Sequence, residues 1–255
     1  MRSVTHLVIH QSDSGFGTAT VIDGWHKERF PADADGKFIG YHRVILNGHR
    51  SKRAAYDPAL DGMIQNGRDY RNKGCHVEYH NAHSIGICCI GKGDAIDFAL
   101  RHSDSDYRYV VLTDADYTYP AAFVPQMVKI LDEHPDVGMV SGNRFNSHLH
   151  KEAMHDTNYI GNQILAFAQS MLNGVTMRDP LTGLRVIRWE ILKDWRPKSD
   201  GFDIEVEMNR FVRKKGYRIV EIEIPYRQRL GDKKLRLSHG FTILKRIISE
   251  NASSP

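Results

Sequence analysis

Hydrophobic residues in the first third of the chain form short runs that predict β-strands. These runs are VTHLVIH (4–10), IGYHRVIL (39–46) and HSIGICCIG (83–91), which are rich in Val, Ile, Tyr or Cys. A helix is expected over TATVIDGWHKER (18–29), because Val21, Ile22 and Trp25 recur at helical spacing, with Thr18 or Thr20 as the N-cap. The stretch 55–74 is dense in Gly, Asp, Asn and Pro, so we expect hairpins and loops there.

After Gly91 the pattern changes to a regular alternation of strands and helices. The almost continuously apolar run YRYVVLTDAD (107–116) is typical of a strand buried on both faces. Helices are expected over 94–102, 121–134, 158–174, 203–216 and 239–250, with strands over 137–144 and 217–226. We therefore predict an α/β fold with a mixed to largely parallel sheet and flanking helices.

Composition and charge restrict the possible partners and compartments. Hydrophobic residues make up 41% of the chain and charged residues 26%, as in soluble globular proteins, and the net charge is only +4. Residues 1–91 carry 11 Lys/Arg against 9 Asp/Glu, so neither part is a polycation and we expect no nucleic-acid partner. Three cysteines and no signal-peptide pattern favour a cytoplasmic protein, one that can also lie against a membrane.

Several separated blocks in the first third resemble the zinc-dependent N-acetylmuramoyl-L-alanine amidases, which include amidase-type phage lysozymes and peptidoglycan recognition proteins. The blocks are VIHQS, WHKERF, GYHRVILNG, DGMIQNGRDYRNKGCHVEYHN and SIGICCIG, within residues 5–91. The resemblance implies a mixed sheet flanked by helices and cleavage of peptidoglycan. It also implies that His10 is a zinc ligand, Tyr41 a catalytic residue and His76 part of the substrate groove.

The zinc site implied by this resemblance is incomplete. A catalytic zinc needs about three protein ligands and an open position for water. The family takes a second His and a Cys from its last third, yet residues 92–255 contain no cysteine. We therefore expect neither bound zinc nor amidase activity. Two alternatives for His10 are a local hydrogen bond at the strand end and an improvised zinc set with Asp114 or Asp116.

From Gly91 to about residue 238 the chain resembles family-2 glycosyltransferases, in particular the dolichyl-phosphate (polyprenyl-phosphate) mannosyl- or glucosyltransferases. The matching blocks are GKGDAI, VVLTDADYTYP, SGNR, DPLTGLRVIR, GFDIEVEM and IPYRQRLGDKKL, in the family's order. The resemblance implies a GT-A-like part that moves a sugar from a nucleotide diphosphate-sugar to a polyprenyl phosphate. The acceptor would be met at a membrane surface.

Asp114 and Asp116 are the candidate metal and catalytic residues of this part. They follow a buried apolar strand, and open α/β sheets bind ligands at the carboxyl ends of their strands. Carboxylate oxygens that hold Mg²⁺ or Mn²⁺ can neutralise the diphosphate as the sugar leaves. The alternative is an ordinary turn at the end of the strand.

The acceptor phosphate requires cations rather than a strong base. Arg144, Arg229 and Lys234 match the family's basic residues, while Asp179 and Thr182 match the block beside the acceptor. Lys233 stands where the family has Ser, and Lys233, Lys234 and Arg236 can alternatively form a solvated charge run. Glu205 and Glu207 begin a predicted helix, where they are either catalytic or complement its dipole.

The two resemblances meet near Gly91, which divides the chain into an amidase-like region, 1–91, and a transferase-like region, 92–255. Both families have strand–helix–strand at this junction, so one continuous sheet is the alternative to two partial domains. The family's first 75 or so residues, with the nucleobase pocket, have no counterpart here. We therefore also consider an inactive or engineered chimera.

The helix predicted over 239–250 has two interpretations. Phe241, Leu244, Ile247 and Ile248 recur at helical spacing, with Lys245 and Arg246 opposite. An amphipathic helix with basic flanks suits a membrane surface, whereas most apolar stripes of this kind pack on their own domain.

Overall fold

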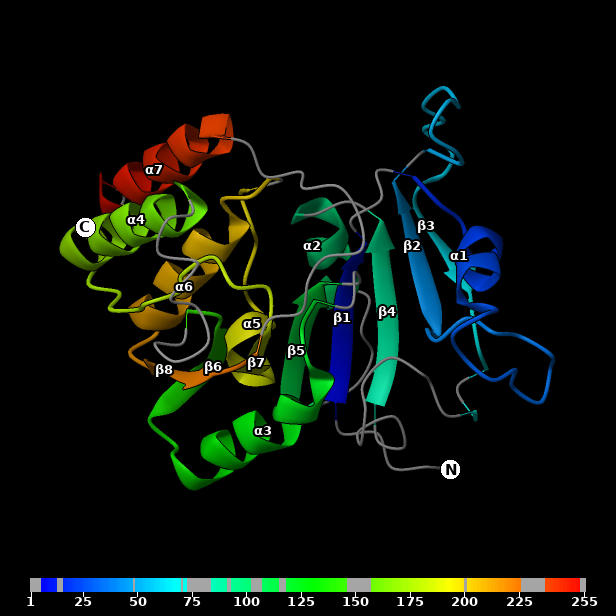
Figure 1. The fold of residues 1–255 in the computed structure, drawn as a ribbon, viewed down its shortest axis with the longest axis horizontal. Coiled ribbons are helices and arrows are strands. Elements are labelled where there is room, and N and C mark those ends of the chain that lie inside the picture. Colours follow the sequence, from blue (N-terminus) through cyan, green and yellow to red (C-terminus); the bar gives the residue numbers. More distant parts are fainter. Residues whose placement is uncertain are drawn as a thin grey trace. The chain divides into compact units, whose positions relative to one another are not determined.

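The computed structural model describes residues 6–12, 16–47, 49–69, 71–72, 84–90, 93–101, 107–114, 118–145, 157–199, 201–225 and 237–252. These residues form two compact units, a first unit over Met1–Asp116 and a second over Tyr117–Pro255 (Figure 1). Packing therefore divides the chain after Asp116, whereas the resemblance to known families changes near Gly91. Among the described residues no helix is long and apolar enough to cross a membrane.

The first unit contains a mixed sheet in the strand order β3-β2-β4-β1-β5. Its strands are β1 (His6–Ser12), β2 (Arg43–Asn47), β3 (Asp61–Asn66), β4 (Ser84–Ile90) and β5 (Tyr109–Asp114). β2 pairs antiparallel with β3, a strand within the stretch 55–74 where we expected hairpins and loops. Among the described strands of this unit, β1 is parallel to β4 and β5, and β2 is parallel to β4. The predicted strand–helix–strand at the junction is β4, α2 (Gly93–Arg101) and β5, and β1 lies between the two strands (Figure 1).

Apolar side chains of α1 (Ala19–His26) and β2 form a core cluster in the first unit. Ile22 of α1 packs with Val44 and Leu46 of β2 and with Cys88 of β4. The helix begins where the Thr18 hydroxyl accepts a hydrogen bond from Val21 N–H at 3.2 Å. Of the two N-caps that the sequence allowed, Thr18 and Thr20, the structure has Thr18, and the helix ends at His26, before the predicted end at Arg29.

His26, at the end of α1, is mostly buried and should make stability depend on pH. Its Nδ1 accepts a hydrogen bond from Gly40 N–H at 3.0 Å, which requires a neutral ring. Burial, and then Arg29, lower the pKa of His26 from 6.5 to about 4. As pH falls from 6.5 towards 4 the unfolded chain binds a proton that the folded chain does not, so folding loses free energy. The full pKa difference corresponds to roughly 3 kcal/mol.

We expect urea unfolding to give a free energy about 2 kcal/mol lower at pH 4.5 than at pH 7.5 from this residue. His26→Gln keeps an acceptor for Gly40 but does not titrate, so it should show a smaller loss than the wild type. Equal losses in the two proteins would show that His26 is not responsible.

The second unit contains the strands β6 (Val137–Asn143), β7 (Arg185–Arg188) and β8 (Arg218–Glu223). β6 is buried along its whole length and pairs antiparallel with β7 and parallel with β8. The helical elements are η1 (Ala121–Phe123), α3 (Val124–Glu133), α4 (Thr157–Asn173), α5 (Trp189–Leu192), α6 (Ile204–Lys214) and α7 (Leu237–Ala252). Gly174, at φ +62°, ends α4 as expected for a left-handed C-cap. The predicted α/β fold with a largely parallel mixed sheet and flanking helices is confirmed.

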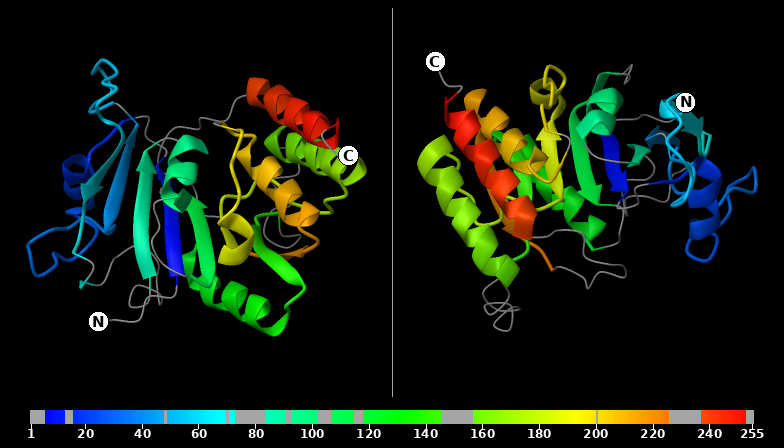
Figure 2. Two further views of the ribbon diagram at one scale, coloured as in Figure 1. Left: turned by 180° about the vertical axis from the view of Figure 1, so that it is seen from behind. Right: turned by 90° about the horizontal axis from the view of Figure 1, so that it is seen from above.

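α7, which contains the helix predicted over 239–250 with its two interpretations, packs against α4 and α6. Ile243 and Ile247 are buried in a cluster with Leu165 of α4 and Val206 of α6. Figures 1 and 2 show α4 and α7 lying side by side. Phe241 and Ile248 remain exposed, so only part of the apolar stripe contributes to the core.

Arg246 of α7 forms an ion pair with Asp203 within the second unit. Its Nε donates to Asp203 Oδ2 at 2.8 Å, and both side chains are largely buried. Ser199 Oγ lies 2.7 Å from both Asp203 Oδ2 and Glu207 Oε2, and Glu207 also accepts from the N–H groups of Lys198 and Ser199. Glu207 therefore fixes the segment before α6 through buried hydrogen bonds.

Candidate functional site

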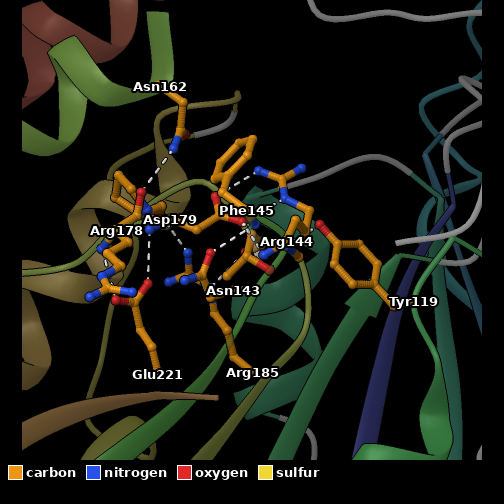
Figure 3. A network of polar contacts seen from close by, with 12 residues as sticks. Tyr119, Asn143, Arg144, Phe145, Asn162, Arg178, Asp179, Arg185 and Glu221 are labelled. Carbon is orange, nitrogen blue, oxygen red and sulfur yellow. Dashed lines mark hydrogen bonds and ion pairs between the residues drawn. The ribbon is translucent and has the colours of Figure 1, made fainter. Parts of the chain in front are cut away.

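Asp179 and Arg144, two of the predicted substrate-binding residues, are in direct contact in the second unit. Arg144 follows the carboxyl end of β6, and Asp179 belongs to the loop between α4 and β7 that we call the 178–183 loop. The buried Asp179 carboxylate accepts from Arg144 Nε at 2.7 Å, from Nη2 at 2.8 Å and from the backbone N–H at 3.1 Å (Figure 3). This two-point contact fixes the plane of a guanidinium whose side chain is 20% exposed.

Glu221 of β8 holds the beginning of the 178–183 loop. Its Oε2 accepts from the N–H of Arg178 at 2.7 Å and its Oε1 from the N–H of Asp179 at 2.8 Å (Figure 3). Burial raises the pKa of Glu221, although these two hydrogen bonds lower it in part. Sequence reasoning did not identify this residue, because a Glu within the apolar run 217–226 matches none of the family blocks.

Arg185 of β7 holds the end of the same loop. Its fully buried guanidinium donates to the carbonyl oxygens of Pro180 at 2.7 Å and Thr182 at 2.9 Å, and to Asn209 Oδ1. Burial is the main cause that lowers the pKa of Arg185. The Tyr119 hydroxyl accepts from Gly183 N–H at 2.7 Å (Figure 3). Charged and polar side chains thus fix the loop at both ends.

Thr182, the other predicted substrate-binding residue of this loop, is fully buried. Among the described residues its hydroxyl has no hydrogen-bond partner. A buried hydroxyl without a partner costs free energy, so such groups require an explanation. A ligand atom that bonds to Thr182 would provide one.

Asp114 lies at the carboxyl end of β5 in the first unit and is partly buried. β5 is parallel to β1, so this carboxylate lies at the edge where open α/β sheets bind ligands. Its hard oxygens fit Mg²⁺ or Mn²⁺. Within the described part of the chain no three His, Cys, Asp or Glu residues form a metal-binding group, and Asp116 lies outside that part.

Of the residues implied by the amidase resemblance, the structure describes the side chain of Tyr41 but not those of His10 and His76. Tyr41 is buried in the core cluster of the first unit with Ile22 and Cys88, and burial raises the pKa of its phenol. The backbone of His10 lies in β1, but its side chain falls outside the described residues. His76, and likewise Arg229 and Lys234 of the transferase resemblance, also lie outside them.

Sequence comparison supports the resemblance to glycosyltransferases more strongly than the resemblance to amidases. Residues 90–196 match the family described as Glycosyl transferase family 2. The chain is 37% identical over 147 residues to a dolichyl-phosphate hexose transferase of Haloferax volcanii. The aligned region covers 57% of this chain and 60% of that relative. It is 34% identical over 74 residues to an endolysin of Klebsiella phage KP32. This aligned region covers 29% of this chain and 37% of the endolysin. The chain therefore spans less than two thirds of either relative.

Structural comparison supports the fold. A glucosyl-3-phosphoglycerate synthase of Mycobacterium tuberculosis, solved with Mn²⁺, uridine-diphosphate and glucosyl-3-phosphoglycerate, matches with a TM-score of 0.53 and 15% identity. The match covers 99% of this chain and 81% of that structure. The same synthase with phosphoglyceric acid gives a TM-score of 0.52 at 16% identity. These values indicate a shared α/β fold.

Proposed function

We propose that this protein is a metal-dependent glycosyltransferase that moves a sugar from a nucleotide diphosphate-sugar to a polyprenyl phosphate. The proposal rests on the contact between Arg144 and Asp179, a residue of the 178–183 loop. The Asp179 carboxylate orients the Arg144 guanidinium for contact with a phosphate. Both residues belong to family blocks, and the match to a dolichyl-phosphate hexose transferase supports the class of acceptor.

In this proposal each charged residue has a separate role. Asp114, with Asp116, would hold Mg²⁺ or Mn²⁺, which neutralises the charge of the leaving diphosphate when it is bound. The Mn²⁺ and UDP in the structural relative support a divalent ion and a nucleotide donor. Arg144 binds and orients the acceptor phosphate, which is already an anion and needs no strong base. The Thr182 hydroxyl donates to one of its oxygens.

Donor binding tests this proposal. Calorimetry should detect a nucleoside diphosphate binding more tightly when Mn²⁺ is present than when the metal is chelated. Lack of binding to UDP and GDP alike, with and without Mn²⁺, would favour the inactive chimera. The amidase remains second, because Tyr41 is enclosed in the core and residues 92–255 lack the Cys ligand.

Two adjacent helices support an acceptor that resides in a membrane. Ile160, Ile164, Phe167 and Met171 recur along α4, and all four are exposed, with Phe167 at 68% and Met171 at 70%. The sequence of α4 contains no Asp, Glu, Lys or Arg. Phe241 of α7 is 78% exposed. Exposed apolar patches of this kind mark interaction sites.

The charge of the sequence that precedes α7 favours an anionic membrane. The segment 226–236, which directly precedes α7, contains five Lys or Arg residues and one Asp. Basic residues beside an apolar helix face are typical of peripheral binding to anionic lipids. Since Arg246 is paired with Asp203, Lys245 is the cation on α7 that remains for lipid headgroups. We therefore propose peripheral membrane association through α4 and α7.

Flotation with anionic liposomes at low salt should retain the wild-type protein, and added salt should weaken the retention. Phe167→Asp should bind at least tenfold more weakly, because it removes an apolar side chain whose burial is worth about 2 kcal/mol. Met63→Asp is the control, since Met63 is an exposed apolar residue of β3 in the first unit. Equal retention of both variants would contradict membrane binding through α4.

A further inference from the structure

Side chains of opposite charge hold the 178–183 loop by different backbone groups. The Glu221 carboxylate accepts from two consecutive N–H groups, those of Arg178 and Asp179. The Arg185 guanidinium donates to the carbonyl oxygens of Pro180 and Thr182. Since a carboxylate can only accept and a guanidinium can only donate, these contacts select one orientation of the loop backbone.

Two consecutive N–H groups that point at one anion form a concavity of the kind that binds phosphate in many proteins. Here Glu221 supplies the anion from within the chain, with one carboxylate oxygen for each N–H. Hydrogen bonds to a charged acceptor are stronger than those between neutral groups. Glu221 therefore fixes the backbone at Asp179, the residue whose carboxylate holds Arg144 in turn.

We propose that Glu221 is a positioning residue, which orients Arg144 for phosphate through the backbone of Asp179. The inference rests on the proposed function, in which Arg144 contacts the acceptor phosphate. The path has two steps, from Glu221 to Asp179 N–H at 2.8 Å and from Asp179 Oδ2 to Arg144 Nε at 2.7 Å. Both steps lie within the second unit.

The same loop is also attached to α4. Asn162 Nδ2 donates to the carbonyl oxygen of Arg178 at 3.2 Å, and Gln163 Nε2 donates to it at 3.3 Å. Glu221 thus accepts from the N–H groups of residues 178 and 179, while the two side chains of α4 donate to the carbonyl oxygen of residue 178. The orientation of Arg144 therefore depends on β8, through Glu221, and also on α4, the helix that we assign to the membrane surface.

The variant Glu221→Gln tests the inference with little change in shape. The Gln amide oxygen replaces one carboxylate oxygen and accepts from one N–H, whereas its NH₂ group replaces the other oxygen and faces the second N–H as a donor. Glu223→Gln is the matched control, because Glu223 lies on the same strand and is exposed. We expect Glu221→Gln to lower kcat/KM for a polyprenyl phosphate at least tenfold, mainly through KM. The KM for the nucleotide-sugar should stay within about twofold of the wild-type value, as should both constants of Glu223→Gln.

A second measurement does not depend on turnover. In ¹⁵N NMR spectra the Arg144 Nε–H signal should shift or broaden in Glu221→Gln and stay unchanged in Glu223→Gln. Loss of thermal stability with unchanged kinetics and an unchanged Arg144 signal would mean that Glu221 only stabilises the fold, which overturns the inference. If the wild-type protein transfers no sugar, the proposed function fails, and an unchanged Arg144 signal in Glu221→Gln would overturn the positioning role separately.

Discussion

Replacing Asp179 by Asn is expected to lower transfer at least a hundredfold and to destabilise the second unit. Asp179 is fully buried, and its carboxylate accepts three hydrogen bonds from Arg144. The Asn side chain has one acceptor and turns its NH₂ group towards a donor, so the guanidinium loses its two-point contact. Removing one partner of a buried ion pair destabilises the fold, because the remaining charge lacks its partner. Since Arg144 is partly exposed, we expect the free energy of unfolding to fall by about 2 kcal/mol.

The matching activity loss should be at least a hundredfold in kcat/KM, because misplacing a phosphate-binding group affects the step that depends on orientation. Asp136→Asn is the control, since its ion pair with Arg218 lies on the surface of the same unit. Exposed ion pairs contribute little to stability. Urea unfolding and steady-state kinetics of both variants measure the difference. Equal effects of the two substitutions would contradict the role assigned to the Arg144–Asp179 pair.

Replacing Asp114 by Asn should have the second largest effect and should act through the metal. Asp114 ends a strand in the first unit, so its partly buried side chain carries little of the core. The Asn amide is a weaker ligand for a hard cation than a carboxylate. We expect at least a hundredfold loss of kcat at a fixed Mn²⁺ concentration, with unfolding free energy within about 0.5 kcal/mol of the wild type.

This loss should be separable from a folding defect. Raising the Mn²⁺ concentration should recover part of the activity of Asp114→Asn, because a weakened site fills at higher concentration. Calorimetry should show weaker Mn²⁺-dependent binding of a nucleoside diphosphate. Wild-type turnover in the Asn variant would exclude Asp114 as a metal ligand.

Much of the fold could be predicted from periodicity and local signals. The Thr18 cap, the buried strand that ends at Asp114 and the Gly174 helix end depend on residues close in sequence, and each occurs in the structure. The position of β1 between β4 and β5 could not be predicted, because strand order depends on pairing between distant segments. The helix-period pattern of α7 likewise could not distinguish the buried Ile247 from the exposed Ile248.

The candidate site shows the same limit. Family blocks pointed to Arg144 and Asp179, and the structure places these residues in contact. They did not indicate Glu221 or the pairing of Arg246 with Asp203, since each contact joins residues more than 40 positions apart. Tyr41 matched an amidase block by sequence, but its surroundings in the core became clear only from the fold.

Formation of a glycosylated lipid is the decisive test of sugar transfer to a lipid phosphate. The protein is incubated with Mn²⁺, a radiolabelled UDP- or GDP-sugar and a polyprenyl phosphate in anionic vesicles, and the lipid phase is then extracted. We predict a labelled polyprenyl-phosphate sugar that disappears when the metal is chelated and falls at least a hundredfold in Asp114→Asn and Asp179→Asn. If folded wild-type protein forms no labelled lipid from any of these donors, the protein does not have this activity. If the variants form as much as the wild type, Asp114 and Asp179 do not have the roles assigned to them.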